Sequence, residues 1–184
     1  MKRYNNKYRI PSARLTDYDY SANGDYFITI CTAGRMRYFG KINKGEMILN
    51  EMGIILENVI SMIAVQFQNI TIVEFIIMPD HVHFIVKINI PVETRLIASL
   101  RNEPQNGGIT GNNNPMFKEG VPRIVRWFKG RATFELRKIN AEFAWQARYH
   151  DRIIRNEREY FAVKQYIKSN PKNWDNDFIN RITV

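Results

Sequence analysis

Two apolar segments in the middle of the chain constrain its fold more than any other feature. Residues 70–77 and 82–88 are rich in β-branched and aromatic side chains, and Met78-Pro79-Asp80 follows the first of them. Proline cannot donate a hydrogen bond to a strand ladder, so Pro79 ends the first segment. The two segments are therefore expected to pair, and their hydrophobicity predicts that both lie at the centre of a sheet.

Strand and helix patterns alternate along the rest of the chain. Strand patterns cover residues 26–32, 38–42, 46–50 and 143–154, and helical spacing of apolar residues covers residues 51–67, 121–139 and 156–169. Asn156 and Glu159 have the spacing of a capping box at the start of the last helix, and Pro171 stops it. This order places helices against an antiparallel or mixed sheet and predicts an α+β fold, a ferredoxin-like sandwich.

The length of 184 residues predicts a single domain over residues 1–184. Residues 1–25 mix basic residues with tyrosines and end in a turn signal, which indicates an arm that leads into the structure. Residues 89–120 lack periodicity and are dense in Asn, Gly and Pro, which predicts a long mobile loop.

The charge balance favours an acidic partner. Lys and Arg number 27 against 18 for Asp and Glu, a net charge of +9, and such an excess attracts nucleic acid or an anionic membrane surface. Cys31 is the only cysteine, which excludes an intrachain disulfide and a multi-cysteine zinc site and favours a reducing compartment. No span approaches twenty apolar residues, and the basic start lacks the apolar core of a secretory signal, so a soluble protein without a membrane partner is expected.

His81 and His83 are two residues apart in the second apolar segment. Alternation along a strand sends both imidazoles to one face and Val82 to the other, so the two rings can converge on one metal ion. An H-x-H spacing is weakly specific, however. Two strand histidines whose hydrogen bonds are satisfied by the backbone would show the same pattern.

Tyr166 and Asn170 are four residues apart and share a face of the last predicted helix. An amide oxygen beside two imidazoles suits Mg²⁺ or Mn²⁺ and would leave positions open for phosphate oxygens. The alternative is that Tyr166 packs in the core while Asn170 caps the helix before Pro171.

The helix that begins near residue 121 is strongly basic. Its cationic residues with the adjacent indole are Arg123, Arg126, Lys129, Arg131, Arg137, Lys138 and Trp127. A phosphate-binding surface is the natural use of such a face, although a merely solvated cationic face is the alternative. The arm interleaves charge and aromatic rings in the same way, as a clamp on a single strand would, through Lys2, Arg3, Tyr4, Lys7, Tyr8 and Arg9.

Three motifs in fixed order make the chain resemble a known family. They are Met78-Pro79-Asp80-His81-Val82-His83, then Trp145-Gln146-Ala147-Arg148-Tyr149-His150-Asp151-Arg152-Ile153-Ile154-Arg155-Asn156-Glu157, then Tyr166-Ile167-Lys168-Ser169-Asn170-Pro171. With residues 26–32, residues 38–40 and Trp174, they are similar to the single-tyrosine HUH transposases, in particular the REP-associated tyrosine transposases and their insertion-sequence relatives. The resemblance spans residues 9–174.

This resemblance implies a ferredoxin-like HUH core that carries out metal-assisted transesterification of single-stranded DNA, often at hairpin or repeat ends. It implies that His81 and His83 bind the metal, that Tyr166 is the nucleophile, and that Asn170 takes the place of a Gln or Asn ligand. Attack by Tyr166 would leave a 5′-phosphotyrosine and a free 3′-hydroxyl, so rejoining would need no nucleotide cofactor. It further implies a nucleoid-associated protein of a bacterial cytoplasm, and it leaves open a homodimer whose sites exchange tyrosine helices.

Two residues depart from the family pattern. Asp80 stands where Asn is usual, as a harmless turn residue or as a charge that would repel phosphate, and His150 stands where an aromatic residue is common. A non-catalytic relative that binds DNA or RNA is the alternative function, against which the intact His81, His83 and Tyr166 argue. Relaxases and replication initiators share the histidine pair but usually place the tyrosine before it.

Overall fold

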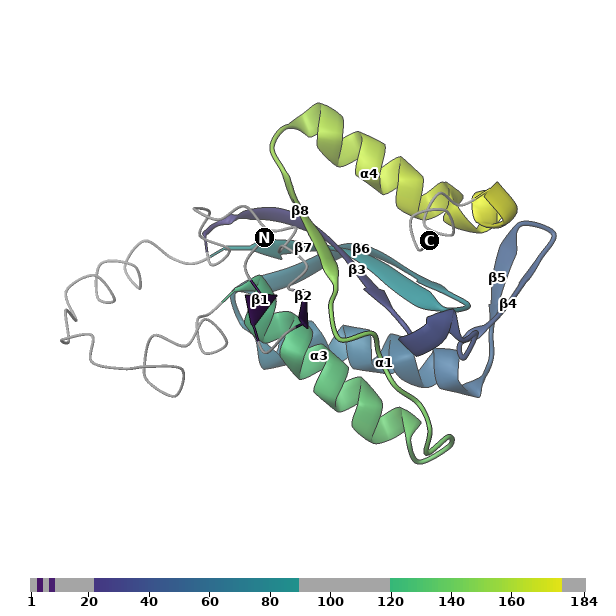
Figure 1. Cartoon of the computed structure of the whole chain (residues 1–184). Helices are drawn as coiled ribbons and strands as arrows, with labels where there is room; N and C mark the ends of the chain where they lie inside the picture. The colour runs from purple at the N-terminus through teal and green to yellow at the C-terminus, as the bar shows by residue number, and fades with distance from the viewer. Residues whose placement is uncertain (1–2, 5–6, 9–21, 90–119, 177–184) are drawn as a thin grey trace.

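The computed structural model describes residues 3–4, 7–8, 22–89 and 120–176 (Figure 1). All of the predicted loop 89–120 except its two end residues, and most of the predicted arm, lie outside these residues. The strands are β1 (Arg3–Tyr4), β2 (Lys7–Tyr8), β3 (Gly24–Cys31), β4 (Gly40–Asn43), β5 (Glu46–Leu49), β6 (Ile70–Met78), β7 (His81–Ile88) and β8 (His150–Ile154). The helices are α1 (Glu51–Gln66), α3 (Val121–Leu136) and α4 (Glu157–Ser169), with short 3-10 turns η1 (Ala33–Arg35) and η2 (Asn170–Asn176).

Four strands form an antiparallel sheet in the order β6-β7-β3-β8. With α1 between β3 and β6 and α3 between β7 and β8, this order is that of a ferredoxin-like sandwich, which confirms the predicted fold class. The expectation that both strands of the apolar pair are central is wrong for β6, which is an edge strand of this sheet. Its sequence is apolar because α1 contacts one face of β6 and α4 the other.

The start of α4 follows its sequence signal. The Asn156 side chain accepts a hydrogen bond from Glu159 N at 2.9 Å, as predicted. The Glu159 carboxylate in turn accepts from Arg155 N at 3.0 Å, one residue before the cap. The direction in which α4 leaves β8 is therefore fixed by hydrogen bonds on both sides of the cap.

The strand predicted for residues 143–154 is too long. Only β8 is regular, and Trp145 makes a single isolated bridge to Thr32. Phe143 is fully buried, and the rings of Trp145, Phe39 and Phe128 lie close by. The aromatic residues of this segment therefore fill the core although their backbone is irregular. Their abundance is the reason why the sequence pattern predicted a strand here.

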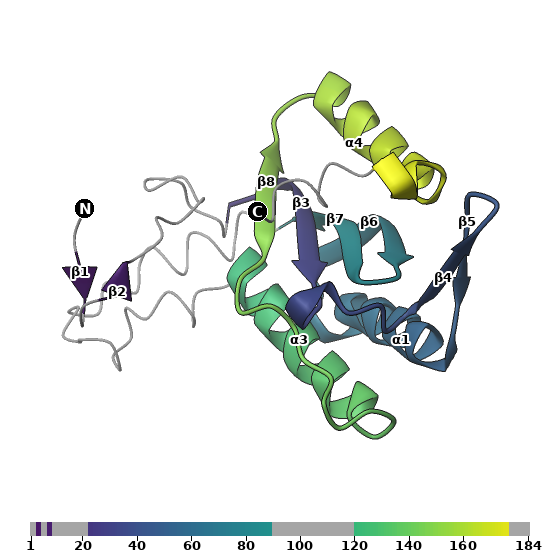
Figure 2. The same ribbon diagram turned by 45° about the vertical axis from the view of Figure 1, so that its right-hand side comes forward.

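The helices divide unequally between the two faces of the sheet (Figures 1 and 2). α1 and α3 pack on one face, where they enclose a large core that includes Ile28, Val82 and Phe84. α4 lies over the other face, above a small apolar cluster built on Ile85, Ile154 and Ile167. None of the helices within the described residues is long and apolar enough to cross a membrane.

Candidate functional site

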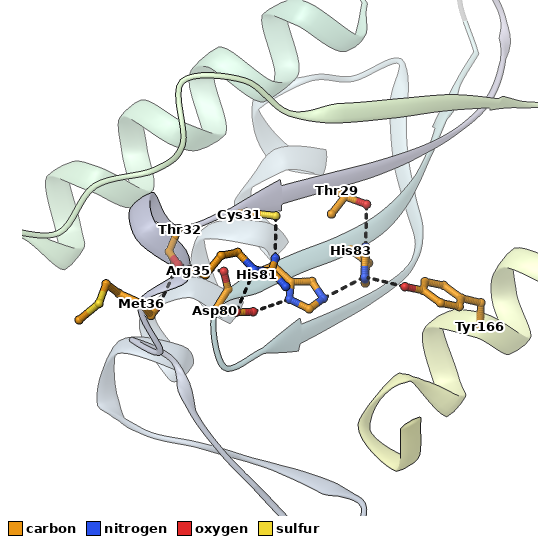
Figure 3. A network of polar contacts seen from close by, with 9 residues as sticks. All are labelled: Thr29, Cys31, Thr32, Arg35, Met36, Asp80, His81, His83 and Tyr166. Atoms are coloured by element: carbon orange, nitrogen blue, oxygen red, sulfur yellow. Dashed lines mark hydrogen bonds and ion pairs between the residues drawn. The ribbon is translucent and has the colours of Figure 1, made fainter. Parts of the chain in front are cut away.

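The two strand histidines lie against each other beneath α4. Both are fully buried, and their Nε2 atoms are 3.0 Å apart. Val82 between them points into the core on the opposite face, so the predicted alternation along β7 is confirmed. Figure 3 shows the pair at the centre of a chain of polar contacts that runs from Cys31 to Tyr166.

The outer nitrogen of each imidazole has a different partner. His81 Nδ1 lies 2.6 Å from Asp80 Oδ1, and His83 Nδ1 lies 2.8 Å from the hydroxyl oxygen of Thr29 on β3. A carboxylate can only accept, so the hydrogen of a neutral His81 is on Nδ1 and its Nε2 presents a lone pair to His83. The Thr29 hydroxyl can donate or accept. When it accepts, both Nε2 lone pairs face one space, an arrangement that suits a cation.

The environment keeps His83 neutral. Complete burial holds the pKa of His83 well below its ordinary value, and Coulombic interactions with His81 and Arg35 lower this pKa further. A neutral imidazole is the form that binds a metal ion.

Tyr166 and Trp174 approach the histidines from the C-terminal segment. The Tyr166 hydroxyl oxygen lies 3.5 Å from His83 Nε2, and the two rings are 5.3 Å apart. The Trp174 ring stacks on His81 with centroids 6.0 Å apart. Phe27 of β3 completes the enclosure by stacking on His83 at 5.2 Å and meeting the Tyr166 ring edge-on. Tyr166 is therefore brought to the histidine pair, as predicted.

Asn170 lies between these two aromatic contacts in sequence, where α4 passes into η2. It is 2% exposed, and its side-chain oxygen is buried with no hydrogen-bond partner among the described residues. A buried amide oxygen without a partner is costly, so this atom indicates a missing ligand more than a helix cap.

The donor set fits a divalent metal ion. Two ligands that bind one ion at right angles and at roughly 2.1 Å lie about 3.0 Å apart, which matches the separation of the two Nε2 atoms. The amide oxygen of Asn170, which is buried without a hydrogen-bond partner among the described residues, is of the donor type that would suit Mg²⁺ or Mn²⁺ as a third ligand. Within the described residues, no group of three or more His, Cys, Asp or Glu side chains is arranged to hold a metal. A third protein ligand would therefore be a residue of another type, such as the Asn170 amide.

Behind His81 the network continues to two residues that the sequence did not single out for the site. Arg35 Nε lies 3.0 Å from Asp80 Oδ2, and Arg35 Nη1 donates to Cys31 Sγ at 2.9 Å. Burial raises the pKa of the Cys31 thiol, and the adjacent guanidinium opposes this rise. Thr29 could have been found from strand alternation, because it faces the same side as the histidines. Arg35 has no comparable signal, since it lies in an irregular turn.

The basic helix α3 packs on the face of the sheet opposite α4 (Figure 1), whereas the histidines lie on the α4 face. Lys129 donates to the carbonyls of Gln146 and Arg148 at 2.6 and 3.2 Å, and burial lowers the pKa of its ammonium. The Trp127 ring meets Phe67 edge-on. The other predicted DNA contacts are Arg123 over the Phe67 ring, Arg131 paired with Glu135, and the exposed Arg126. The DNA role of these residues stays a prediction, and Lys129 is already engaged by the protein itself.

Comparison with known proteins gives one clear homologue. An uncharacterized protein of Haemophilus influenzae is 34% identical over 175 residues, which cover 90% of both chains. The structure of a REP-associated tyrosine transposase bound to a REP hairpin superposes with a TM-score of 0.52 at 19% identity, over 86% of this chain and 74% of that one. A candidate transposase from Deinococcus radiodurans gives a TM-score of 0.45 at 17% identity, over 85% and 96% of the two chains. No model of a protein family matches the sequence.

Proposed function

Because this chain belongs to the family of the Haemophilus influenzae protein and has the fold of a REP-associated tyrosine transposase, we propose that it is a transposase. Its reaction is the cleavage and rejoining of single-stranded DNA through a 5′-phosphotyrosine intermediate. One observation carries this proposal: the Tyr166 hydroxyl oxygen lies 3.5 Å from His83 Nε2, which itself lies 3.0 Å from His81 Nε2. A phenol beside two converging imidazoles is suited to act as a nucleophile next to a cation, and we take the unpartnered Asn170 oxygen as the further ligand.

The chain's own residues account for the bond changes. The phenol of Tyr166 loses its proton and its oxygen attacks phosphorus; the bond from phosphorus to the 3′-oxygen breaks, and this oxygen takes up a proton and leaves as a 3′-hydroxyl. The phosphotyrosine conserves the energy of the broken bond, so attack by a 3′-hydroxyl reverses the step and frees Tyr166. Phe27 packs against both the Tyr166 and His83 rings and keeps the phenol directed at the pair.

His81, His83 and Asn170 would hold a divalent Mg²⁺ or Mn²⁺ ion. Such an ion supplies charge stabilisation at the phosphate oxygens and favours the ionised phenol. Phenol needs this help because its ordinary pKa is near 10.

Single-stranded DNA with hairpin ends is the proposed substrate. The neighbouring transposase structure was bound to a REP hairpin, and the net charge of +9 favours a polyanion. An unpaired strand can bend toward a nucleophile that lies beneath a helix, whereas a duplex backbone is stiff.

The test is a covalent adduct. The protein is incubated with Mn²⁺ and single strands from the flanks of its own gene that are labelled at the 3′ end, because the 3′ fragment is the one that stays attached to the protein. Denaturing gels are used to detect labelled protein. We expect an adduct from the wild type and none from Tyr166→Phe, which removes one oxygen and keeps the ring. Tyr160→Phe is the matched control, because Tyr160 lies on the same helix in the apolar cluster and should leave the adduct intact.

An adduct formed by Tyr166→Phe would contradict the assignment of the nucleophile. Tight DNA binding by the wild type without any adduct would favour the alternative, a non-catalytic relative that binds nucleic acid.

A further inference from the structure

Asp80 directs its two carboxylate oxygens at two different side chains. It is 3% exposed, Oδ1 lies 2.6 Å from His81 Nδ1, and Oδ2 lies 3.0 Å from Arg35 Nε (Figure 3). The carboxylate therefore faces away from the space between the two imidazoles. Its charge is balanced by the guanidinium behind it, so it is not placed to repel a substrate phosphate.

The contact with Asp80 makes His81 different from His83. The partner of His83 is a hydroxyl that can donate or accept, so either tautomer of His83 is satisfied. The partner of His81 can only accept, so only the tautomer with hydrogen on Nδ1 is satisfied. A carboxylate behind a ligating histidine fixes its ring and makes the opposite nitrogen more basic.

Arg35 is held in place by an unusual turn. It is a non-glycine residue with φ of 54°, directly after Gly34 with φ of 60°. A non-glycine residue in this left-handed conformation costs about 1 kcal/mol or more, and the conformation is retained where several contacts of the surrounding structure hold it in place. Here Thr32 supplies the restraint, because its backbone N–H donates to Asp80 O at 2.9 Å and its hydroxyl lies 2.8 Å from Met36 O. The turn that carries Arg35 and the turn that carries Asp80 are thus joined.

We propose that Asp80 and Arg35 are positioning residues for the histidine pair. Asp80 fixes the ring and the tautomer of His81 so that its Nε2 lone pair faces His83, and Arg35 fixes and neutralises Asp80. This rests on the proposed metal role of the pair. It gives Asp80 a structural reason to replace the Asn that is usual at this point of the motif.

The first experiment measures the tautomer of His81 in the absence of DNA and of added metal. Protein with ¹⁵N-labelled histidine rings is studied at pH 8 by long-range proton–nitrogen NMR. The wild type should show a single Nδ1–H tautomer for His81. Asp80→Ala should give a mixture, and Asp80→Asn, which keeps an accepting oxygen, should restore the single form. Thr29→Val is the matched control, because it removes the partner of His83 and should leave the His81 signals unchanged.

A second experiment reads the consequence for the cation. Titration of Mn²⁺ followed by electron paramagnetic resonance should show a Kd raised roughly 10- to 100-fold in Asp80→Ala. Asp80→Asn should lose less than Asp80→Ala. If Asp80→Ala fails to fold, Asp80→Leu fills the volume without accepting and carries the same expectations.

A folded Asp80→Ala or Asp80→Leu protein with an unchanged His81 tautomer would overturn the proposal, and so would unchanged Mn²⁺ affinity. The tautomer result is independent of strand cleavage. A protein that shows the expected tautomers but forms no DNA adduct would disprove the transposase proposal and leave the positioning role standing.

Discussion

At β7, the two faces of the four-stranded sheet are equally buried, but different kinds of side chain cover them. Val82 and Phe84 on one face and His81 and His83 on the other are all fully buried. The first two pack among the apolar side chains of α1 and α3. The histidines meet a carboxylate, a hydroxyl and a phenol, and α4 above them has Ile167 as its one buried residue among those described.

This difference shows how one strand can meet two opposing requirements. Burial of apolar groups stabilises the fold by roughly 25 cal/mol per Å². Burial of imidazoles costs free energy that hydrogen bonds only offset. Because neighbouring residues of β7 face opposite sides, the stabilising face and the face that carries the histidines, called the reactive face after the reaction proposed there, can change independently. The following predictions test that independence.

The largest effect is expected from the apolar face. Phe128 is fully buried, and its ring meets Phe84 at 5.5 Å. Phe128→Ala should lower the free energy of unfolding by about 4 kcal/mol through lost contacts and a cavity. Phe27→Ala is the matched change on the reactive face, where the ring is partly exposed, and should cost less than half as much. Urea denaturation measures both, and equal losses would remove the distinction between the faces.

A smaller loss is expected where the reactive face holds charge. Arg35→Met leaves the Asp80 carboxylate buried without its guanidinium and should cost about 3 kcal/mol. The double variant Arg35→Met with Asp80→Asn removes both charges and should regain most of that loss. Thermal or urea unfolding of the wild type, the two single variants and the double variant gives the coupling energy. If the loss of unfolding free energy in the double variant equals the sum of the losses in the two single variants, the two residues act separately.

The smallest expected effect is a pH dependence from the reactive face. Burial lowers the pKa of His83 in the folded state, so the unfolded chain takes up a proton there first as the pH falls below about 6.5. The free energy of unfolding should therefore decrease toward lower pH, by at most about 1.4 kcal/mol per pH unit from this residue. His83→Gln should have a shallower slope than the wild type in urea titrations between pH 7.5 and 5.5. Parallel slopes would contradict a neutral His83.

Regular spacing explains which parts of the structure the sequence could predict. The shared face of His81 and His83 follows from the period of a strand, and the cap at Asn156 follows from local hydrogen bonding. The helix position of Tyr166 likewise places it four residues before Asn170. These features depend on residues that are close together in the chain, so the sequence alone is enough to predict them.

Other features depend on contacts that spacing does not encode. The edge position of β6 was missed because helices cover both of its faces and make it as apolar as a central strand. Trp145 was assigned to a strand because core packing and strands favour the same aromatic residues. Arg35 and the internal contacts of Lys129 were missed because each charge meets a partner across irregular backbone. From the sequence alone, a charged residue in a turn is expected to face solvent.

The contacts of the tyrosine helix have a consequence for the order of synthesis. Thr29, His83 and Tyr166 meet in space although 54 and 83 residues separate successive members in the chain. On a ribosome, the whole four-stranded sheet is synthesised before α4, and the phenol reaches the histidines only after residue 166 has emerged. A nascent or prematurely ended chain can therefore complete its sheet without possessing the phenol. The proposed cutting activity is thereby restricted to molecules whose translation has passed the last helix.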